Sequence, residues 1–381
     1  MLICTIKEAL DDIRLGKMVI ICADEDQENE GDITMAAEKV TPESINFMAK
    51  YGRGIICLTL DEEKIKQLGL TLMTKDNTSP FRTPFTVSID ARQGVTTGIS
   101  AYDRATTILM AIADDARPES FSRPGHIFPL QARRGGVLKR TGQIEGSVDL
   151  ARLANLKPAG VICGIMKDDG TMARMPDLEK FAAEHNLKIV TVASIINYRI
   201  QKEHLVKRVI TATLPTYYGG DFELIIYENE IDNAYHMALI KGEWDSNEPV
   251  LVRVHSQCLL GESLGSKHCN CGAKLRAAMK MIQKEGKGVI LYMPQETSSI
   301  GLLTKCKNYA LQDNGHYARE ANEVLGSKMH LQNYGVGAQI LRDLKVKRLR
   351  IMTNNLPKKV VALQGYGLII EEQVPIEIPS G

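Results

Sequence analysis

Short apolar runs alternate with amphipathic stretches along the whole chain. Ile6, Leu10 and Ile13 are spaced as one face of a helix, which predicts an amphipathic helix at the start of the sequence. The apolar run 17–22 comes next and predicts a buried strand. A helix is then expected from Pro42 to Tyr51, because threonine and proline suit its first positions and a glycine follows its last.

The same alternation continues to the end of the chain. Apolar runs predict further strands at 54–60, 157–166, 188–192, 209–214, 222–227, 288–292 and 348–352. Helical spacing predicts helices at 178–186 and 275–286, and another that starts near Tyr334. Strands and helices that alternate up to about residue 200 indicate a layered α/β domain.

The chain is longer than one hydrophobic core usually organises. With 381 residues, two domains are expected. A polar stretch at 199–208 marks the crossing between them. We therefore expect a first domain at residues 1–200, a linker at 201–208 and a second domain at 209–381.

Composition and charge exclude several classes of function. Hydrophobic residues make up 44% and charged residues 24% of the chain, as in ordinary globular proteins. The net charge of +1 gives no electrostatic reason for binding nucleic acid or membranes, and no apolar stretch is long enough to span a bilayer. Acidic residues stand where a signal peptide needs positive charge, and the eight cysteines are scattered, mostly in apolar runs. We expect a cytoplasmic protein that acts on a small molecule.

Three cysteines close together form the strongest chemical signal. Cys258, Cys269 and Cys271 lie within fourteen positions, and three thiolates that leave one position open are the ligand set of a catalytic Zn²⁺. Reduced thiols packed as small apolar residues are the alternative. The spacing and the polar neighbours favour the metal; these neighbours are His255, Gln257, His268 and Asn270.

Weaker signals for cation and phosphate binding lie in the first half of the chain. Six carboxylates occur in the nine positions 24–32, where Mg²⁺ could neutralise them, although a solvated acidic loop fits the run equally well. The polar turns 76–79 and 94–100 could hold a phosphate or be plain loops. His126 is more often structural than catalytic when considered alone.

Taken together, these motifs resemble the family of bifunctional riboflavin-pathway enzymes that join 3,4-dihydroxy-2-butanone 4-phosphate synthase to GTP cyclohydrolase II. The synthase side rests on residues 24–32, 94–104, 123–130 and 169–174. The cyclohydrolase side rests on the three cysteines and on residues 253–256, 300–303, 337–342 and 353–355. The resemblance covers nearly the whole chain. It implies a synthase-like layered α/β domain followed by a cyclohydrolase-like α+β domain, in a homodimer.

For the first domain, the resemblance implies ribulose 5-phosphate as substrate, a divalent metal and release of formate. The implied residues are Glu28 as metal ligand, Glu30, Asp32, Cys57 and His126 in catalysis, and Thr97 and Arg140 in substrate binding. The departures from the family pattern are Gln27 for an arginine, Gln143 for a metal-binding histidine, Ile144 for a phosphate-binding threonine and Gly164 for a proton-transferring glutamate. An amide is a weaker ligand than an imidazole, and glycine cannot move a proton.

For the second domain, the resemblance implies that zinc-bound hydroxide opens the guanine ring of GTP. The implied residues are Cys258, Cys269 and Cys271 on the metal, with Arg253, Gln295, Glu296, Thr353 and Lys359 in substrate binding. The departures are Ser298 and Gln332 for arginines, His330 for an aspartate, Gln257 for a glutamate, Tyr317 and Ala318 for an aspartate and a threonine, and an inserted Leu356. The loss of two arginines argues against a triphosphate.

Three hypotheses follow from these replacements. The first is a repurposed, neofunctionalised zinc enzyme of hydrolase or lyase type, which has lost both family activities and acts on a sugar-phosphate-derived or purine-like substrate. In it, His268 or His330 serves as proton carrier or further zinc ligand. The second is that one or both family activities persist, and the third is a non-catalytic, metabolite-binding partner of a paralogue. Zn²⁺ is expected in the second domain, while Mg²⁺ in the first is left open because Gln143 replaces a histidine.

Overall fold

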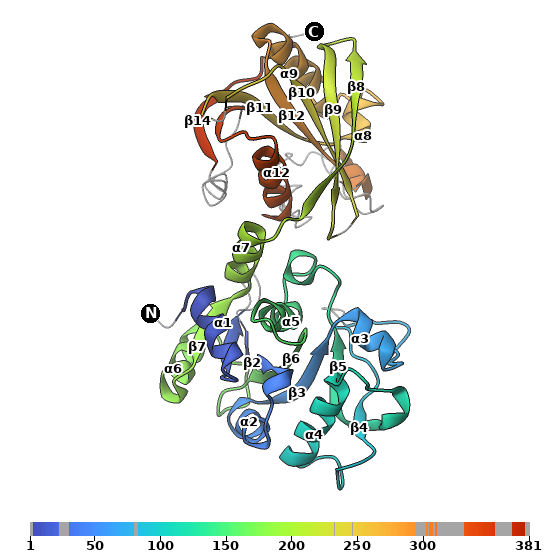
Figure 1. Ribbon diagram of the computed structural model, residues 1–381, viewed down its shortest axis with the longest axis vertical. Coiled ribbons are helices and arrows are strands. Elements are labelled where there is room, and N and C mark those ends of the chain that lie inside the picture. Colours follow the sequence, from blue (N-terminus) through green and yellow to red (C-terminus); the bar gives the residue numbers. More distant parts are fainter. Residues whose placement is uncertain are drawn as a thin grey trace. The chain divides into compact units, whose positions relative to one another are not determined.

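The computed structural model describes residues 3–22, 30–79, 83–231, 233–245, 247–294, 302–303, 305–307, 309–310, 331–354 and 368–377. The chain divides into two compact units, Met1–Arg199 and Ile200–Gly381 (Figure 1). Each unit has a mixed seven-stranded sheet with helices packed on it, so the predicted fold class is confirmed. Residues 201–208, predicted as a linker, hold the last residues of one helix and the first of a strand. The domain limits themselves stay a prediction.

The sheet of unit 1 has the strand order β4-β5-β3-β6-β2-β1-β7. Its strands are β1 (Val19–Cys22), β2 (Gly31–Ala36), β3 (Arg53–Leu60), β4 (Ile89–Ala91), β5 (Phe121–Gln131), β6 (Ala159–Ile165) and β7 (Lys188–Thr191). The pairs β1–β7 and β3–β5 are parallel, and the other pairs are antiparallel. Its helices are α1 (Ile6–Arg14), α2 (Pro42–Phe47), α3 (Glu62–Gln67), α4 (Ala101–Ile112), α5 (Gln143–Leu153), α6 (Met175–His185) and α7 (Val192–Lys202), which runs past the end of the unit.

Local sequence explains where the first helices begin. Thr5 and Glu8 form a capping box at the start of α1, in which each side chain hydrogen-bonds the backbone of the other. Thr41 caps α2 in the same way with Ser44, and Pro42 occupies the first helical position. These caps satisfy backbone N–H groups that a helix start leaves without partners.

The register of unit 1 brings three predicted positions to one face of the sheet. Cys57 on β3 pairs with Ile162 on β6, and Asp32 on β2 pairs with Gly164, two residues farther along β6. Because side chains alternate between the faces of a strand, all four residues share a face. Helix α5 packs against β2, β3 and β6, and its Ile144 joins Cys57 and Ile162 in a buried cluster. Asp32, Cys57 and Gly164 therefore lie on the α5 side of the sheet.

The sheet of unit 2 has the strand order β14-β13-β11-β12-β10-β9-β8. Its strands are β8 (Val206–Thr216), β9 (Gly220–Asn229), β10 (Tyr235–Lys241), β11 (Pro249–Ser256), β12 (Gly288–Met293), β13 (Arg348–Met352) and β14 (Ile369–Val374). The strands β14, β13, β11 and β12 run parallel, and β12, β10, β9 and β8 are antiparallel. Its helices include α8 (Leu259–Glu262), α9 (Cys271–Glu285) and α12 (Leu331–Asp343).

Two helices cover the sheet of unit 2. Ala278 and Ile282 of α9 are fully buried and pack with Ile290 of β12 in one hydrophobic cluster. The next residue, Leu291, points to the opposite face and approaches Gly337 of α12. The core of unit 2 is thus two-sided, and the carboxyl end of β11 leads to the segment that carries the three cysteines.

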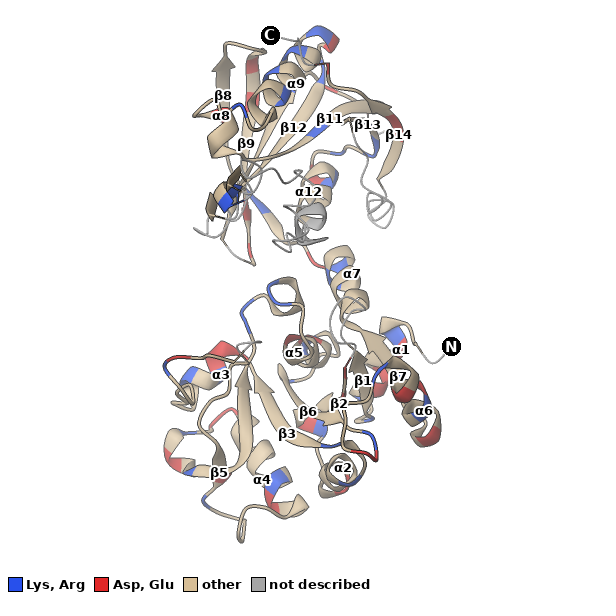
Figure 2. Ribbon diagram, turned by 180° about the vertical axis from the view of Figure 1, so that it is seen from behind, with Lys and Arg blue, Asp and Glu red and all other residues tan. Residues whose placement is uncertain are grey.

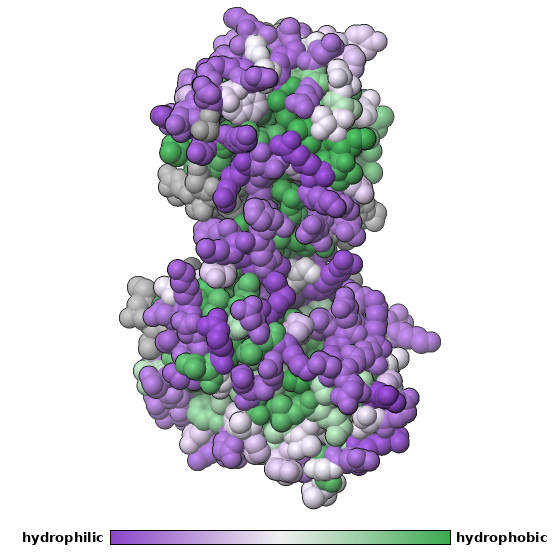
Figure 3. Space-filling model, in the orientation of Figure 1, coloured by the Kyte–Doolittle hydropathy of each residue, from purple (hydrophilic) through white to green (hydrophobic). Residues whose placement is uncertain are grey.

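Charges of both signs are mixed on the surface of both units (Figure 2). Figure 2 shows Lys and Arg interspersed with Asp and Glu in both units, in agreement with the net charge of +1. Hydrophilic side chains cover most of the face seen in Figure 3, and hydrophobic ones gather in patches between them in both units. No helix in the part of the chain that the structure describes is long and apolar enough to cross a membrane.

Candidate functional site

The three predicted metal ligands come together in unit 2. Cys258 follows β11 as the N-terminal cap of α8, while Cys269 and Cys271 lie just before α9 and at its first residue. Their sulfur atoms all lie within 4.8 Å of one another, and Cys258 is 2% exposed. Within the described ranges, this is the one group of three or more Cys, His, Asp or Glu side chains close enough to share an ion.

The spacing of the sulfur atoms fits Zn²⁺. A tetrahedral site with zinc–sulfur bonds of about 2.3 Å places its sulfur atoms about 3.8 Å apart. Cys258 Sγ and Cys269 Sγ are separated by 3.7 Å. Gly261 preserves this arrangement, because a Cβ there would lie 3.1 Å from Cys258 Sγ and closer still to Cys269 Sγ. The donor set and its spacing therefore match a zinc centre with one position left for water or substrate.

Charged and aromatic neighbours surround the cysteine cluster. Burial works against ionisation of Cys269, but hydrogen bonding, first from Tyr309 and then from the Cys271 amide, lowers the pKa of its thiol to about 7. Burial raises the pKa of Cys271 to about 12, opposed by the charge of Lys305. Lys305 Nζ lies 2.6 Å from Cys258 Sγ. Cys269 is thus poised to ionise before Cys271, and a cation stands beside the cluster.

Sequence reasoning missed several of these neighbours. Lys305 and Tyr309 lie more than thirty residues after Cys271, the last of the three ligands, so no spacing pattern connects them to the cluster. Tyr309 stacks on the ring of His268 with 4.5 Å between centroids. Glu262 and Tyr292, which hydrogen-bond each other close to Cys258, were also missed. An acidic residue four positions after a ligand was the one signal available for Glu262.

Two of the predicted GTP-binding residues lie near each other. Arg253 on β11 is half-buried, and its Nη1 donates to the carbonyl of Met352 at 2.9 Å. Thr353 follows directly and donates its amide N–H to Val374 at 2.9 Å. Burial lowers the pKa of Arg253. The remaining predicted residues of this pocket lie outside the described residues; they are Gln295, Glu296, His330 and Lys359.

Asp32 and Cys57 are the chemically distinctive groups of unit 1. Burial, reinforced by the charge of Glu30, raises the pKa of Asp32 to about 7. Burial, followed by the charge of Asp32, raises the pKa of Cys57 to about 12, so Cys57 is a neutral thiol at physiological pH. Gly164 leaves space beside them, because a Cβ there would sit 3.5 Å from Asp32 Oδ1. Glu28 lies outside the described residues.

His126 is held by an acidic residue on a neighbouring strand. Its Nδ1 lies 2.7 Å from Asp90 Oδ2, and its backbone N–H donates to Asp90 Oδ1 at 2.9 Å. Gly98 has a φ of 89° and leaves no room for a Cβ against this pair, so the turn requires glycine. The amides of Thr96 and Gly98 donate to Asp103, which leaves them unavailable for the phosphate that the turn could have held. The exposed Thr97 stays a predicted substrate-binding residue.

The positions that depart from the family pattern in unit 1 have contacts of their own. Gln143 Nε2 donates to the carbonyl of Glu30 at 3.2 Å, so this amide ties α5 to the acidic segment. Ile144 is buried with Cys57. Arg140 Nη1 lies 3.6 Å from Oε1 of the fully buried Glu145. Burial raises the pKa of Glu145, and the charge of Arg140 partly lowers it again.

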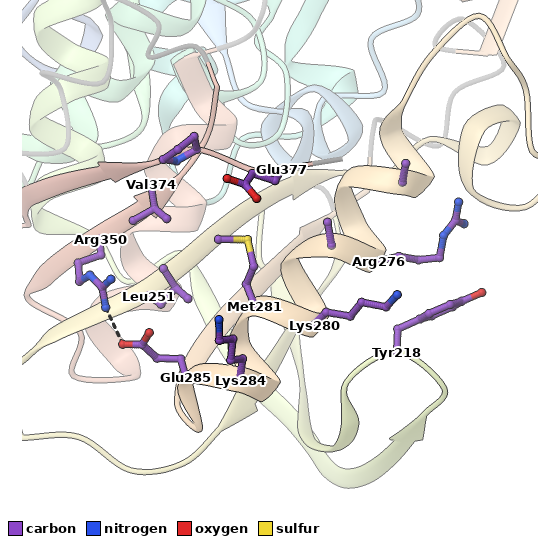
Figure 4. A pocket seen from close by; sticks show the side chains of 13 residues that line it. Tyr218, Leu251, Arg276, Lys280, Met281, Lys284, Glu285, Arg350, Val374 and Glu377 are labelled. Carbon is purple, nitrogen blue, oxygen red and sulfur yellow. Dashed lines mark hydrogen bonds and ion pairs between the residues drawn. The ribbon is translucent and has the colours of Figure 1, made fainter. Parts of the chain in front are cut away.

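A cavity of about 790 Å³ runs along the outer face of α9 (Figure 4). Arg276, Lys280 and Lys284 project from the helix, and Tyr218 stands at one end. None of the three cysteines lines it, nor does any other predicted site residue. This cavity is therefore separate from the predicted site residues.

Comparison with known proteins covers nearly the whole chain. Residues 7–198 match the family model of 3,4-dihydroxy-2-butanone 4-phosphate synthase, and residues 207–375 match that of GTP cyclohydrolase II. The riboflavin biosynthesis protein RibBA of Aquifex aeolicus is 58% identical over 98% of this chain and 92% of its own length. RibBA of Cytophaga hutchinsonii is 54% identical over 99% of this chain and 93% of its own.

Solved structures agree with these sequence matches. The crystal structure of RibBX, a two-domain 3,4-dihydroxy-2-butanone 4-phosphate synthase from A. baumannii, superposes with a TM-score of 0.78 and 40% identity. It covers 97% of this chain and 99% of the other. A synthase solved with two magnesium ions matches 52% of this chain and 98% of its own, with a TM-score of 0.50 and 37% identity.

These comparisons contradict the prediction of a repurposed enzyme that has lost both family activities. More than half of all residues are identical to proteins named for riboflavin biosynthesis, over almost the full length of both chains. The cysteine ligands keep the spacing of a zinc site. The prediction was wrong because it relied on single replaced side chains. One sequence alone cannot show how similar the rest of the chain is to the family. Neofunctionalisation has no support.

Proposed function

Because this chain belongs to the family of bifunctional riboflavin-biosynthesis enzymes, we propose that it carries out that family's chemistry. Unit 1 would convert ribulose 5-phosphate to 3,4-dihydroxy-2-butanone 4-phosphate and formate, and unit 2 would open the guanine ring of GTP. The observation that carries the proposal is the 58% identity to a RibBA protein over 98% of the chain, together with an intact three-cysteine cluster. We also propose that the protein works as a homodimer.

In unit 2, we assign the zinc to Cys258, Cys269 and Cys271. When bound, Zn²⁺ supplies a water molecule of lowered pKa and a Lewis acid at neutral pH. The chain provides the remaining parts. Lys305, beside Cys258 Sγ, offsets the negative charge of the thiolates, and the half-buried Arg253 offers a guanidinium for an anionic substrate.

In unit 1, Asp32 is our candidate for the group that moves protons. A general acid–base works best when its pKa lies near the working pH, and that of Asp32 is raised to about 7. A Cβ at position 164 would lie 3.5 Å from Asp32 Oδ1, so Gly164 leaves the space beside this carboxylate open. Cys57 is placed as a neutral thiol on the same face. We assign a divalent cation to the acidic segment that includes Glu28, by analogy with the synthase solved with magnesium.

Formate release tests each half separately. Purified protein is incubated with ribulose 5-phosphate and Mg²⁺, or with GTP, and formate is measured with formate dehydrogenase while mass spectrometry identifies the second product. Cys258→Ser should abolish formate from GTP and leave formate from ribulose 5-phosphate unchanged. Asp32→Asn should do the reverse. Zinc-replete wild-type protein that releases no formate from either substrate would refute the proposal.

A further inference from the structure

The carboxylate of Glu262 accepts three hydrogen bonds beside the cysteine cluster. The backbone N–H of Cys258 donates to its Oε1 at 2.6 Å, and the tyrosine hydroxyl of Tyr292 donates to its Oε2 at 2.6 Å. His255 Nε2 lies 2.9 Å from Oε1, which places the ring proton on Nε2. The Glu262 side chain is 11% exposed, so these contacts are largely shielded from water.

The three donors come from three different elements. His255 and Tyr292 are register partners on the parallel strands β11 and β12, and their rings stack with 5.8 Å between centroids. Cys258 begins α8, and the Glu262 backbone N–H donates to the Cys258 carbonyl at 2.9 Å. Glu262 therefore holds Cys258 at both its N–H and its carbonyl, and fastens it to the end of the sheet.

Cys258 needs such a support more than the other two ligands do. Cys269 and Cys271 are adjacent to the start of α9 and move with it, whereas Cys258 arrives from the strand side of the site. Its Sγ accepts the Gly261 N–H at 3.2 Å, which fixes the sulfur relative to the short helix α8 but not relative to the sheet. The 3.7 Å separation from Cys269 thus depends on what anchors α8.

We propose that Glu262 is a positioning residue for the metal centre: its carboxylate sets the orientation of Cys258 and so the geometry of the three-sulfur site. The inference rests on the proposed function to the extent that the cluster holds zinc. Outer groups that orient metal ligands typically change metal affinity 10–100-fold when removed. A carboxylate suits the role because its two oxygens can accept from all three donors at once.

Zinc affinity of a small set of variants tests this role. Glu262→Ala removes all three acceptor contacts and leaves room for water to satisfy the donors, so the unit should still fold. Glu262→Gln keeps the length and one acceptor oxygen. Tyr292→Phe is the matched control, because it removes only the contact to Oε2 and leaves Cys258 and His255 held. Competition with a chromogenic chelator gives the affinity of each protein, and circular dichroism confirms folding.

We expect a 10–100-fold loss of zinc affinity for Glu262→Ala, about three- to tenfold for Glu262→Gln, and less than threefold for Tyr292→Phe. In Co²⁺-loaded protein, the d–d absorption bands of Glu262→Ala should shift, because they report the geometry of the ligands. Affinities and bands equal to wild type in both Glu262 variants would overturn the inference alone. If Glu262→Ala does not fold, an unchanged Glu262→Gln overturns it. A wild-type protein that binds no zinc would overturn the proposed cyclohydrolase chemistry as well.

Discussion

Replacing Gly261 with alanine should destroy the metal centre through a single added methyl group. The new Cβ would lie 3.1 Å from Cys258 Sγ and closer still to Cys269 Sγ, whereas ordinary non-bonded contacts begin at about 3.5–4.0 Å. At least one sulfur must move by more than about 0.5 Å, while metal–ligand distances tolerate about 0.2 Å. Overpacking of this kind typically costs about 1–3 kcal/mol. We expect zinc affinity to fall at least about tenfold, since about 1.4 kcal/mol corresponds to a factor of ten.

Gly337→Ala is the matched control for this experiment. Gly337 lies in helix α12 of the same unit, and its nearest contact for a new Cβ is 3.7 Å, to Leu291 Cδ1. Alanine there should leave zinc binding unchanged and stabilise the helix by about 0.5–1 kcal/mol. Zinc per subunit is measured by atomic absorption after dialysis against a chelator of known affinity. Wild-type zinc content in Gly261→Ala would refute the assignment of the site, because it would mean that the sulfur atoms are not held at the described spacing.

Three further predictions concern unit 1. Gly164→Glu should raise formate release from ribulose 5-phosphate at least about tenfold, because the site has room for a Cβ and gains a second proton carrier. Gly164→Gln is equal in size and carries no proton, so it should not raise the rate. Equal rates for the two variants would contradict this prediction. Folding raises the pKa of Asp32, so its contribution to the free energy of unfolding is fully present below the unfolded pKa of 3.8 and is lost as the pH rises through the folded pKa of about 7. Asparagine does not ionise. The free energy of unfolding of Asp32→Asn, measured in urea, should therefore gain about 2 kcal/mol over that of wild type between pH 5 and pH 8. No gain would show that Asp32 is well solvated. Asp149→Ala should lower the free energy of unfolding by about 3–5 kcal/mol in the same assay, because it leaves the buried Arg199 without the carboxylate 2.8 Å away. A loss under about 1 kcal/mol would refute the pairing.

The sequence could predict strands that are apolar on both faces. The runs 157–166 and 288–292 became β6 and β12, which lie inside their sheets and need apolar side chains on both sides. Strand β5 was missed, because Pro124, Gly125 and Pro129 within it are typical of loops. Strand β5 therefore lacks the apolar run that β6 and β12 carry, although it too lies inside its sheet.

Helix α5 was missed for a different reason. Three of its buried residues are polar, namely Glu145, Ser147 and Asp149, so the apolar spacing of an amphipathic helix is broken. Two of the three pair with groups distant in sequence: Ser147 with Thr59 at 2.7 Å, and Asp149 with Arg199. Burial of paired polar groups is a property of the folded chain that no local pattern reports.

The candidate metal site was predictable only in part. Three cysteines within fourteen positions reveal a ligand set, because short spacing confines them in space. Their supports do not share that spacing: Tyr292 comes from the next strand of the sheet and Lys305 from beyond it. Likewise, Asp90 became the partner of His126 only through the pairing of β4 with β5.

The replaced residues of unit 1 show why counting lost side chains misjudged the protein. Gln143 cannot bind a metal as histidine does, but its amide holds the backbone of Glu30 and so shapes the segment that leads into β2. Gly164 cannot carry a proton, but its missing side chain leaves the adjacent Asp32 carboxylate beside open space, with a pKa suited to proton transfer. A departure from a family pattern therefore removes one route to a function and can leave another in place. The side chains around the replaced position decide which groups can still carry out the chemistry.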